Sequence, residues 1–124
     1  DVALDGCGSC ALYIPPNTSE TIVVATRCEF ANSHYGARIL GSLISATFNN
    51  CVFHGNEVDG IYVYQSTIHL HGEATAIHSN RYGIYASVSA KVLIHLPSHH
   101  NTIYNNGNHD RRAVVGATIT NVED

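Results

Sequence analysis

Residues 58–72, V-D-G-I-Y-V-Y-Q-S-T-I-H-L-H-G, contain two short runs in which apolar and polar side chains alternate. The first run is 61–64 and the second is 67–71, and Gln65 and Ser66 lie between them. Alternation with a period of two is typical of a β-strand that has one buried face. This stretch therefore predicts two consecutive strands with aliphatic residues inward and tyrosine, threonine and histidine outward.

The same pattern recurs along the chain. One apolar position returns about once every two dozen residues, as Phe30, Phe53, Ile77 and Ile103. A polar residue follows three places later in each copy: Ser33, Asn56, Asn80 and Asn106. A glycine comes soon afterwards in the first three copies: Gly36, Gly60 and Gly83. A repeat of this length, with short strands and no helical periodicity, predicts a β-solenoid.

The N-x-x-G-I-x-V type of pattern in these copies resembles the right-handed parallel β-helix proteins, a family that includes pectate lyases, polygalacturonases and alginate epimerases. The resemblance covers about residues 25–122, and weaker copies lie around 12–14 and 117–122. It implies an all-β fold, a right-handed parallel β-helix of about five coils with about 23–24 residues per coil. We expect one domain over residues 1–124, either a whole protein or part of a longer repeat protein.

The composition argues against two classes of partner. The formal charge is −4, Lys91 is the single lysine and the arginines are scattered, so no basic patch is available for a phosphate backbone. No apolar run approaches the roughly 20 residues of a membrane-spanning helix. We therefore expect neither nucleic acid nor a membrane as partner, and a carbohydrate or another protein remains. The sequence does not indicate a localisation.

The four cysteines form two groups. The C-G-S-C motif of Cys7 and Cys10 is compatible with half of a zinc site or with a redox pair, but the first needs two more ligands nearby and the second needs a βαβ context. Cys28 and Cys51 each precede a phenylalanine by two residues, so strand alternation places them on the phenylalanine's inward face. We expect these two to be stacked, buried thiols.

The recurring polar and glycine positions predict structural roles. Stacked coils place equivalent residues one strand spacing apart, so Asn56, Asn80 and Asn106 are expected to form a ladder at one turn. We call these three residues the asparagine ladder. The three recurring glycines listed above are expected at corners where the backbone adopts a positive φ.

Outward-facing residues of successive coils give the first candidate site. Tyr13, Arg38, Tyr62 and Tyr85 occupy one outward position of the strand after the corner, and we call them the tyrosine–arginine row. Aromatic faces with a guanidinium between them form a platform on which sugar rings or apolar partner surfaces can stack. The alternative interpretation is that these tyrosines are ordinary residues of exposed strands.

The second candidate site is rich in imidazole. His69 and His71 share an outward face, and a shift by one repeat places His95 over His71. These three residues, the histidine cluster, are candidate ligands for a borderline metal ion such as zinc. The alternative is that they are solvated strand residues, and nothing else in the sequence indicates a cofactor.

The sequence assigns no catalytic residue. Paired Asp-Asp, G-H-G and R-x-K motifs of the polysaccharide-cleaving relatives are absent. A hydrolase needs two carboxylates at a set separation, and a lyase needs a base with a neutralising partner. Asp59 and the stacked pair His54 and His78 are the first residues to consider if the chain is an enzyme.

Two further expectations concern the C-terminal part and the ends. The segment 97–112 breaks the rhythm and predicts an extended polar turn, with a cluster drawn from these residues: His99, His100, His109, Asp110, Arg111 and Arg112. No helical cap is evident at either end of the predicted solenoid. Uncovered coils expose strand edges, so we expect either end-to-end homo-oligomerisation or origin from a longer repeat protein.

Two function classes follow from the sequence. The favoured class is a non-catalytic binding or structural module for carbohydrate or protein along the tyrosine–arginine row. The alternative is a small carbohydrate-active enzyme of the polysaccharide lyase or epimerase type. An ice-binding surface needs regular outward threonine ladders, and only Thr118 and Thr120 fit that pattern.

Overall fold

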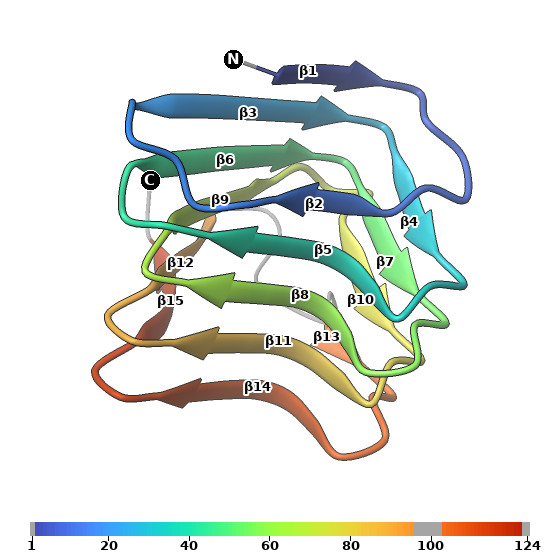
Figure 1. The fold of residues 1–124 in the computed structure, drawn as a ribbon. Helices are drawn as coiled ribbons and strands as arrows, with labels where there is room; N and C mark the ends of the chain where they lie inside the picture. The colour runs from blue at the N-terminus through green and yellow to red at the C-terminus, as the bar shows by residue number, and fades with distance from the viewer. Residues whose placement is uncertain (1, 96–102, 123–124) are drawn as a thin grey trace.

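A computed structural model describes residues 2–95 and 103–122, and this part of the chain contains strands and turns but no helix. The strands wind into a parallel β-solenoid, whose three sheets run along one axis (Figure 1). The predicted all-β parallel β-helix is therefore confirmed. Over the same described residues, no helix is long and apolar enough to cross a membrane.

Three sheets, which we call A, B and C, contain all the strands of the described residues. Sheet A has the order β1 (Val2–Asp5), β3 (Thr21–Thr26), β6 (Ile44–Asn49), β9 (Thr67–His71), β12 (Lys91–His95) and β15 (Thr118–Val122). Sheet B has the order β13 (Ile103–Tyr104), β10 (Ala76–His78), β7 (Val52–His54) and β4 (Glu29–Ala31). Sheet C has the order β14 (His109–Val114), β11 (Tyr82–Ser87), β8 (Asp59–Tyr64), β5 (Tyr35–Leu40) and β2 (Leu12–Ile14).

Each coil passes from sheet A to B to C and then rises to the next level. Parallel pairing sets Thr67 beside Lys91, so one complete coil begins at Thr67 and ends at Ala90. Neighbouring strands of a sheet lie about 4.8 Å apart, so equivalent side chains of successive coils stack directly. This stacking is what turns a sequence repeat into rows of like residues on each face.

The interior is a continuous apolar column. Phe30 and Phe53 stack with ring centroids 5.0 Å apart, and Phe48 meets Phe53 edge to face at 5.1 Å. The aliphatic residues of the strands quoted at the outset, such as Ile61 and Ile68, are fully buried. Alternation along each strand therefore places the apolar residues inward, as the sequence predicts.

The asparagine ladder is confirmed at the turn between sheets B and C. Asn56 Nδ2 donates to Asn80 Oδ1 at 2.8 Å, and Asn80 Nδ2 donates to Asn106 Oδ1 at 3.0 Å. Asn80 Nδ2 also donates to the Phe53 carbonyl oxygen at 3.0 Å. The last amide, Asn106 Nδ2, donates to Asp110 Oδ1 at 2.9 Å, so a carboxylate ends the ladder. Each rung satisfies turn backbone as well as its neighbour.

The predicted role of the recurring glycines is wrong. None of Gly36, Gly60 and Gly83 has a positive φ. Steric room explains them instead, because a Cβ on Gly60 would lie 2.7 Å from the Gly83 carbonyl oxygen and 2.8 Å from Asn80 Nδ2. The glycines are needed where the asparagine ladder and the next coil come closest to the backbone.

The expectation of an extended polar turn over 97–112 is also wrong for the part of that segment that the structure describes. From Ile103 onward the chain rejoins the solenoid as β13 and β14. His99 and His100 lie outside the described residues. The other four members are consecutive residues of β14 and are divided between its two faces, so they do not form one cluster.

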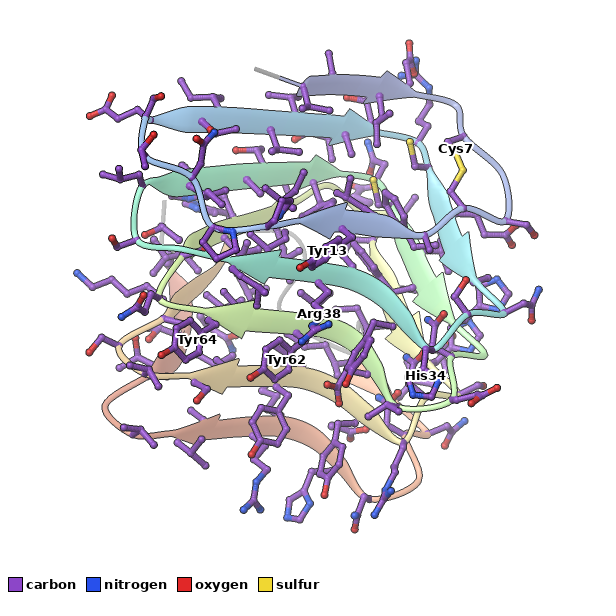
Figure 2. The ribbon with its side chains drawn as sticks, viewed as in Figure 1. Cys7, Tyr13, His34, Arg38, Tyr62 and Tyr64 are labelled. Carbon is purple, nitrogen blue, oxygen red and sulfur yellow. A yellow bond between two sulfur atoms is a disulfide. The ribbon has the colours of Figure 1, made fainter. Side chains whose placement is uncertain are left out.

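The cysteines separate as their spacing suggests. Cys7 and Cys10 form a disulfide, visible as the yellow bond in Figure 2, so they are not a zinc half-site in this state. Cys28 and Cys51 are free and buried, as predicted. Burial is the main reason that the pKa of the Cys51 thiol is raised to about 11.

Candidate functional site

The tyrosine–arginine row lies on the outer face of sheet C, one member per coil. Strand register pairs Tyr13 with Arg38, Arg38 with Tyr62, and Tyr62 with Tyr85. Figure 2 shows Tyr13, Arg38 and Tyr62 one below another on this face. Arg112 of β14 pairs with Tyr85 and continues the line, a residue that the sequence analysis assigned to a turn.

Contacts within the row follow its length. The Arg38 guanidinium carbon lies 5.5 Å from the Tyr13 ring centroid and 5.9 Å from that of Tyr62. The Tyr62 and Tyr85 rings stack 5.6 Å apart with 25° between their planes, and the Arg112 guanidinium carbon lies 5.7 Å from the Tyr85 centroid. The faces of Tyr62 and Tyr85 are thus turned toward neighbours. A platform of open ring faces, as the sequence suggested, is not what this face presents.

A second line of aromatic residues supports the row from the side. Tyr35 meets Tyr62 at 5.9 Å and Tyr82 meets Tyr85 at 5.4 Å, each edge to face. His109 stacks on Tyr82 at 5.9 Å. Neither Tyr35 nor Tyr82 is among the residues predicted for a site from the sequence, and His109 is predicted to lie in a polar turn. The Y-G pairs at 35–36 and 82–83 could have predicted this second line, because the residue before each recurring glycine takes the same position in each coil.

Asp59 occupies the same position between Tyr35 and Tyr82 in the register. Its residue exposure is 2 %, and Oδ1 has no hydrogen-bond partner in the described part of the chain. Loss of hydration on burial raises the pKa of this carboxyl from 3.8 to about 7, although the charge of Arg81 acts in the opposite direction. Asp59 is therefore a buried acid that titrates near neutral pH.

Arg38 and Arg112 are the two cations in line with the phenols of Tyr62 and Tyr85. Across the described residues, neither Arg38 nor Arg112 takes part in an ion pair, and Nε of Arg38 is buried without a hydrogen-bond partner. The pKa of the Tyr62 hydroxyl is raised, first by burial and then by neighbouring Tyr85. This phenol is therefore protonated at neutral pH and available as a donor.

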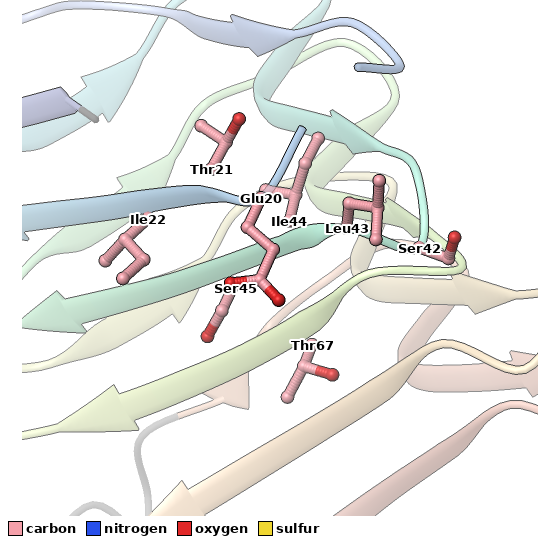
Figure 3. Close-up of a pocket in the computed structure, with 8 residues that line it drawn as sticks. All are labelled: Glu20, Thr21, Ile22, Ser42, Leu43, Ile44, Ser45 and Thr67. Carbon is pink, nitrogen blue, oxygen red and sulfur yellow. The ribbon is translucent and has the colours of Figure 1, made fainter. Parts of the chain in front are cut away.

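A hollow of about 230 Å³ opens at the N-terminal end of the row. Tyr13, Tyr35 and Arg38 line it together with His34, whose Nδ1 lies 3.0 Å from Glu57 Oε2. A second hollow of about 380 Å³ lies on sheet A and is drawn in Figure 3. That hollow is lined by serine, threonine and aliphatic residues with Glu20, and it brings together no cation or aromatic side chain.

The predicted stacking of His54 and His78 is observed on sheet B, with ring centroids 5.2 Å apart. Tyr104 stacks on His78 at 5.1 Å. His54 Nε2 lies 2.7 Å from Glu29 Oε2, and this hydrogen bond is the largest cause of the lowered pKa of Glu29. Asp59 lies on sheet C and these histidines on sheet B, so the three residues first considered for catalysis are on different faces.

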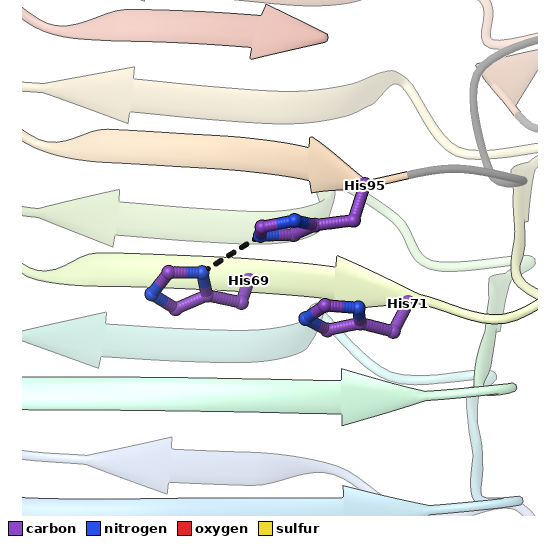
Figure 4. Close-up of side chains that lie close together, drawn as sticks. All are labelled: His69, His71 and His95. Atoms are coloured by element: carbon purple, nitrogen blue, oxygen red, sulfur yellow. Dashed lines mark hydrogen bonds between the residues drawn. The ribbon is translucent and has the colours of Figure 1, made fainter. Parts of the chain in front are cut away.

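The histidine cluster lies on the outer face of sheet A. One ring nitrogen from each of His69, His71 and His95 lies within 4.8 Å of the others (Figure 4). His69 Nδ1 and His95 Nε2 share a hydrogen bond of 2.9 Å, and the His71 and His95 rings stack at 4.0 Å. Burial, followed by the charges of the two neighbours, lowers the pKa of His69.

Comparison with known families agrees with this geometry. A family model described as a right handed beta helix region matches residues 1–123. The chain belongs to the right-handed β-helix family. Comparisons of this right-handed β-helix protein with curated proteins and with solved structures give no match. Family membership therefore fixes the fold, and the chemistry of the outer faces has to indicate the function.

Proposed function

We propose that this right-handed β-helix protein is a binding module for an acidic saccharide, which lies along the outer face of sheet C. One observation carries the proposal: the guanidinium groups of Arg38 and Arg112 have no carboxylate partner within the described chain and share one line with the phenols of Tyr62 and Tyr85.

The chemistry of these groups suits a uronate chain. Guanidinium presents paired N–H donors that match the two oxygens of a carboxylate. A phenol both donates and accepts hydrogen bonds, as do sugar hydroxyls. The members of the row recur once per coil, at the strand spacing of about 4.8 Å. A linear polymer with regularly spaced carboxylates and hydroxyls therefore meets either a phenol or a guanidinium at each step.

The ring arrangement favours hydrogen bonding over ring stacking. Tyr62 and Tyr85 cover each other's faces, so the row presents ring edges, hydroxyls and guanidinium groups to solvent. Tyr13, at 56 % exposure, is the most open ring of the row and borders the hollow of about 230 Å³. One sugar at the end of the chain fits against this ring, and the rest of the chain follows the row.

Calorimetric titration with matched acidic and neutral oligosaccharides tests the proposal. We expect the acidic series to bind and Arg38→Gln to weaken binding by about 10- to 150-fold, since hydrogen bonds to charged groups contribute about 1.5–3 kcal/mol. Arg27→Gln is the matched control, because Arg27 forms an exposed ion pair of 2.7 Å with Asp5 away from sheet C. Equal affinity for neutral sugars, or equal loss in both variants, contradicts the proposal.

Two substitutions at one position separate hydroxyl from ring. Tyr62→Phe keeps the stack on Tyr85 and removes only the phenol oxygen, whereas Tyr62→Ala removes both. If the phenol hydrogen-bonds to the saccharide, both variants lose affinity for the acidic oligosaccharide. A loss confined to Tyr62→Ala would support an apolar contact, such as a protein partner, over a saccharide.

A second candidate function, uronate lyase or epimerase, is favoured by Asp59 alone. A base with a pKa of about 7 suits abstraction of the proton next to a carboxylate, and an arginine suits neutralisation of that carboxylate. The 2 % exposure of Asp59 opposes this function, because a substrate carbon has to reach the carboxylate. Ultraviolet absorbance of the unsaturated products of a lyase, absent in Asp59→Asn, would show that the function is catalysis and not binding alone.

A further inference from the structure

We propose that the histidine cluster binds one divalent metal ion of the zinc type, with three protein ligands and an open fourth position. This site lies on sheet A, whereas the saccharide surface proposed above lies on sheet C. The two proposals therefore stand or fall separately.

Two neighbouring strands place the three imidazoles. β9 presents His69 and His71 two residues apart, hence on the same outward face. On β12, Ile94 pairs with Leu70 of β9. The next residues in the same register are His95 and His71, so His95 lies beside His71 on the next coil. His-x-His on one strand and a third histidine on its neighbour form a triangle on a rigid sheet, and only side-chain rotation is needed to direct all three toward one point.

The distances suit a small ion. With Zn–N bonds of about 2.0–2.1 Å, tetrahedral ligand nitrogens lie about 3.3 Å apart. His69 Nδ1 and His95 Nε2 are 2.9 Å apart, and the third nitrogen lies within 4.8 Å. A metal replaces the proton that His69 and His95 share. The His71 and His95 rings, with 12° between their planes, tilt toward each other on binding because nitrogen lone pairs lie in the ring planes.

Among the described residues, the strands beside the cluster add no negative charge to the site. Register places Thr47 beside His69 and Asn49 beside His71 on β6, and Leu93 beside His69 on β12. None of these neighbours is a carboxylate, so the ligands from the described strands are three neutral imidazoles. An ion held in this way keeps its double positive charge and takes water or an external anion as the fourth ligand.

Equilibrium dialysis of the tag-free protein with Zn²⁺ alone measures the site. We expect one ion per chain, and at least a tenfold loss of affinity in His69→Gln and in His95→Gln. His78→Gln is the matched control, since His78 also stacks on another histidine but lies on sheet B. Unchanged affinity in the two cluster variants, or an equal loss in the control, overturns the site.

A second measurement needs no variant and so does not depend on variants folding. Co²⁺ replaces Zn²⁺ and absorbs visible light strongly when four-coordinate and weakly when six-coordinate. We expect the strong spectrum on addition of one equivalent of Co²⁺, abolished by one equivalent of Zn²⁺. The weak spectrum of hydrated Co²⁺ throughout the titration overturns the proposal. Melting curves of the metal-free variants identify any loss that comes from unfolding.

Discussion

At the residue scale, Asp59 shows how the solenoid changes the chemistry of one side chain. The carboxyl lies between Tyr35 and Tyr82 in the register and near Arg81, but no partner in the described chain takes up its Oδ1. A buried carboxylate without partners is costly, so the neutral acid is favoured and its pKa is raised to about 7. The sequence names Asp59 as a residue to consider for catalysis, but it does not reveal that the side chain is buried or that its pKa is raised.

Asp59→Asn is expected to change how stability depends on pH. Because the folded-state pKa is raised, the parent keeps the stability from its neutral acid below pH 3.8 and loses it progressively as the pH rises through about 7. The variant stays neutral, so it gains roughly 2–4 kcal/mol relative to the parent between pH 4 and pH 8. Urea unfolding at both pH values measures this gain.

An exposed carboxyl provides the control for that measurement. Glu20→Gln removes a charge of the same sign at the corner before β3 and should leave the difference between the two pH values unchanged. If the free energy of unfolding depends on pH in the same way in the parent and in Asp59→Asn, then folding does not raise the pKa of Asp59.

At the scale of elements, the asparagine ladder holds the turns between sheets B and C. Asn80→Ala removes two donated bonds, to Asn106 Oδ1 and the Phe53 carbonyl oxygen. It also removes the Oδ1 acceptor of the Asn56 backbone N–H and side-chain amide. Buried groups left unsatisfied cost about 1–3 kcal/mol each, so we expect a loss of about 2–4 kcal/mol in the free energy of unfolding.

Chemical denaturation compares this variant with Asn121→Ala, where the side chain is exposed on β15. We expect Asn121→Ala to stay within about 0.5 kcal/mol of the parent, as surface substitutions usually do. Equal losses in the two variants would mean that the ladder adds nothing beyond an ordinary surface asparagine.

The strands and rows were predictable because they depend on two periods, the alternation within a strand and the recurrence from one coil to the next. The row on sheet C, the histidine cluster and the asparagine ladder all follow from those periods. Gly60 was misjudged because its constraint is a contact with Gly83 and Asn80 of the next coil, which no local pattern reveals. The stacking of Tyr62 on Tyr85 depends on rotamers, and spacing alone does not determine ring orientation.

At the scale of the whole molecule, a charged residue lies at one end of the described solenoid. Arg111 lies on β14, the outer strand of sheet C in the described structure, and pairs with the core residue Ile84. It thus takes an inward position that isoleucine holds one coil earlier. Burial lowers the pKa of Arg111, a sign that its charge is partly dehydrated. An inward charge at a strand edge opposes pairing with another edge.

Arg111→Ile is expected to promote end-to-end association, the form of oligomerisation that the sequence predicts for uncovered coils. The substitution extends the apolar column to the outer coil and removes the charge that a stacked copy would bury. Size-exclusion chromatography with light scattering measures the mass over a range of concentrations. A mass unchanged from the parent would show that Arg111 does not control this end.

The three outer faces carry different chemistry on one scaffold: phenol and guanidinium on sheet C, imidazole on sheet A, and stacked His54 and His78 on sheet B. Outward residues at equivalent positions of successive coils form a row along one face. Such a row is long enough to contact an extended ligand at several points. We propose that, of these three faces, the face of sheet C recognises a saccharide.

Amide chemical-shift mapping by NMR tests that claim most directly. The ¹⁵N-labelled protein is titrated with an oligouronate, and the shift changes are assigned to strands. We expect the largest changes in β5, β8 and β11, centred on Arg38 and Tyr62. Changes centred on sheet A or sheet B, or no change at a saturating concentration of the oligouronate, would contradict it.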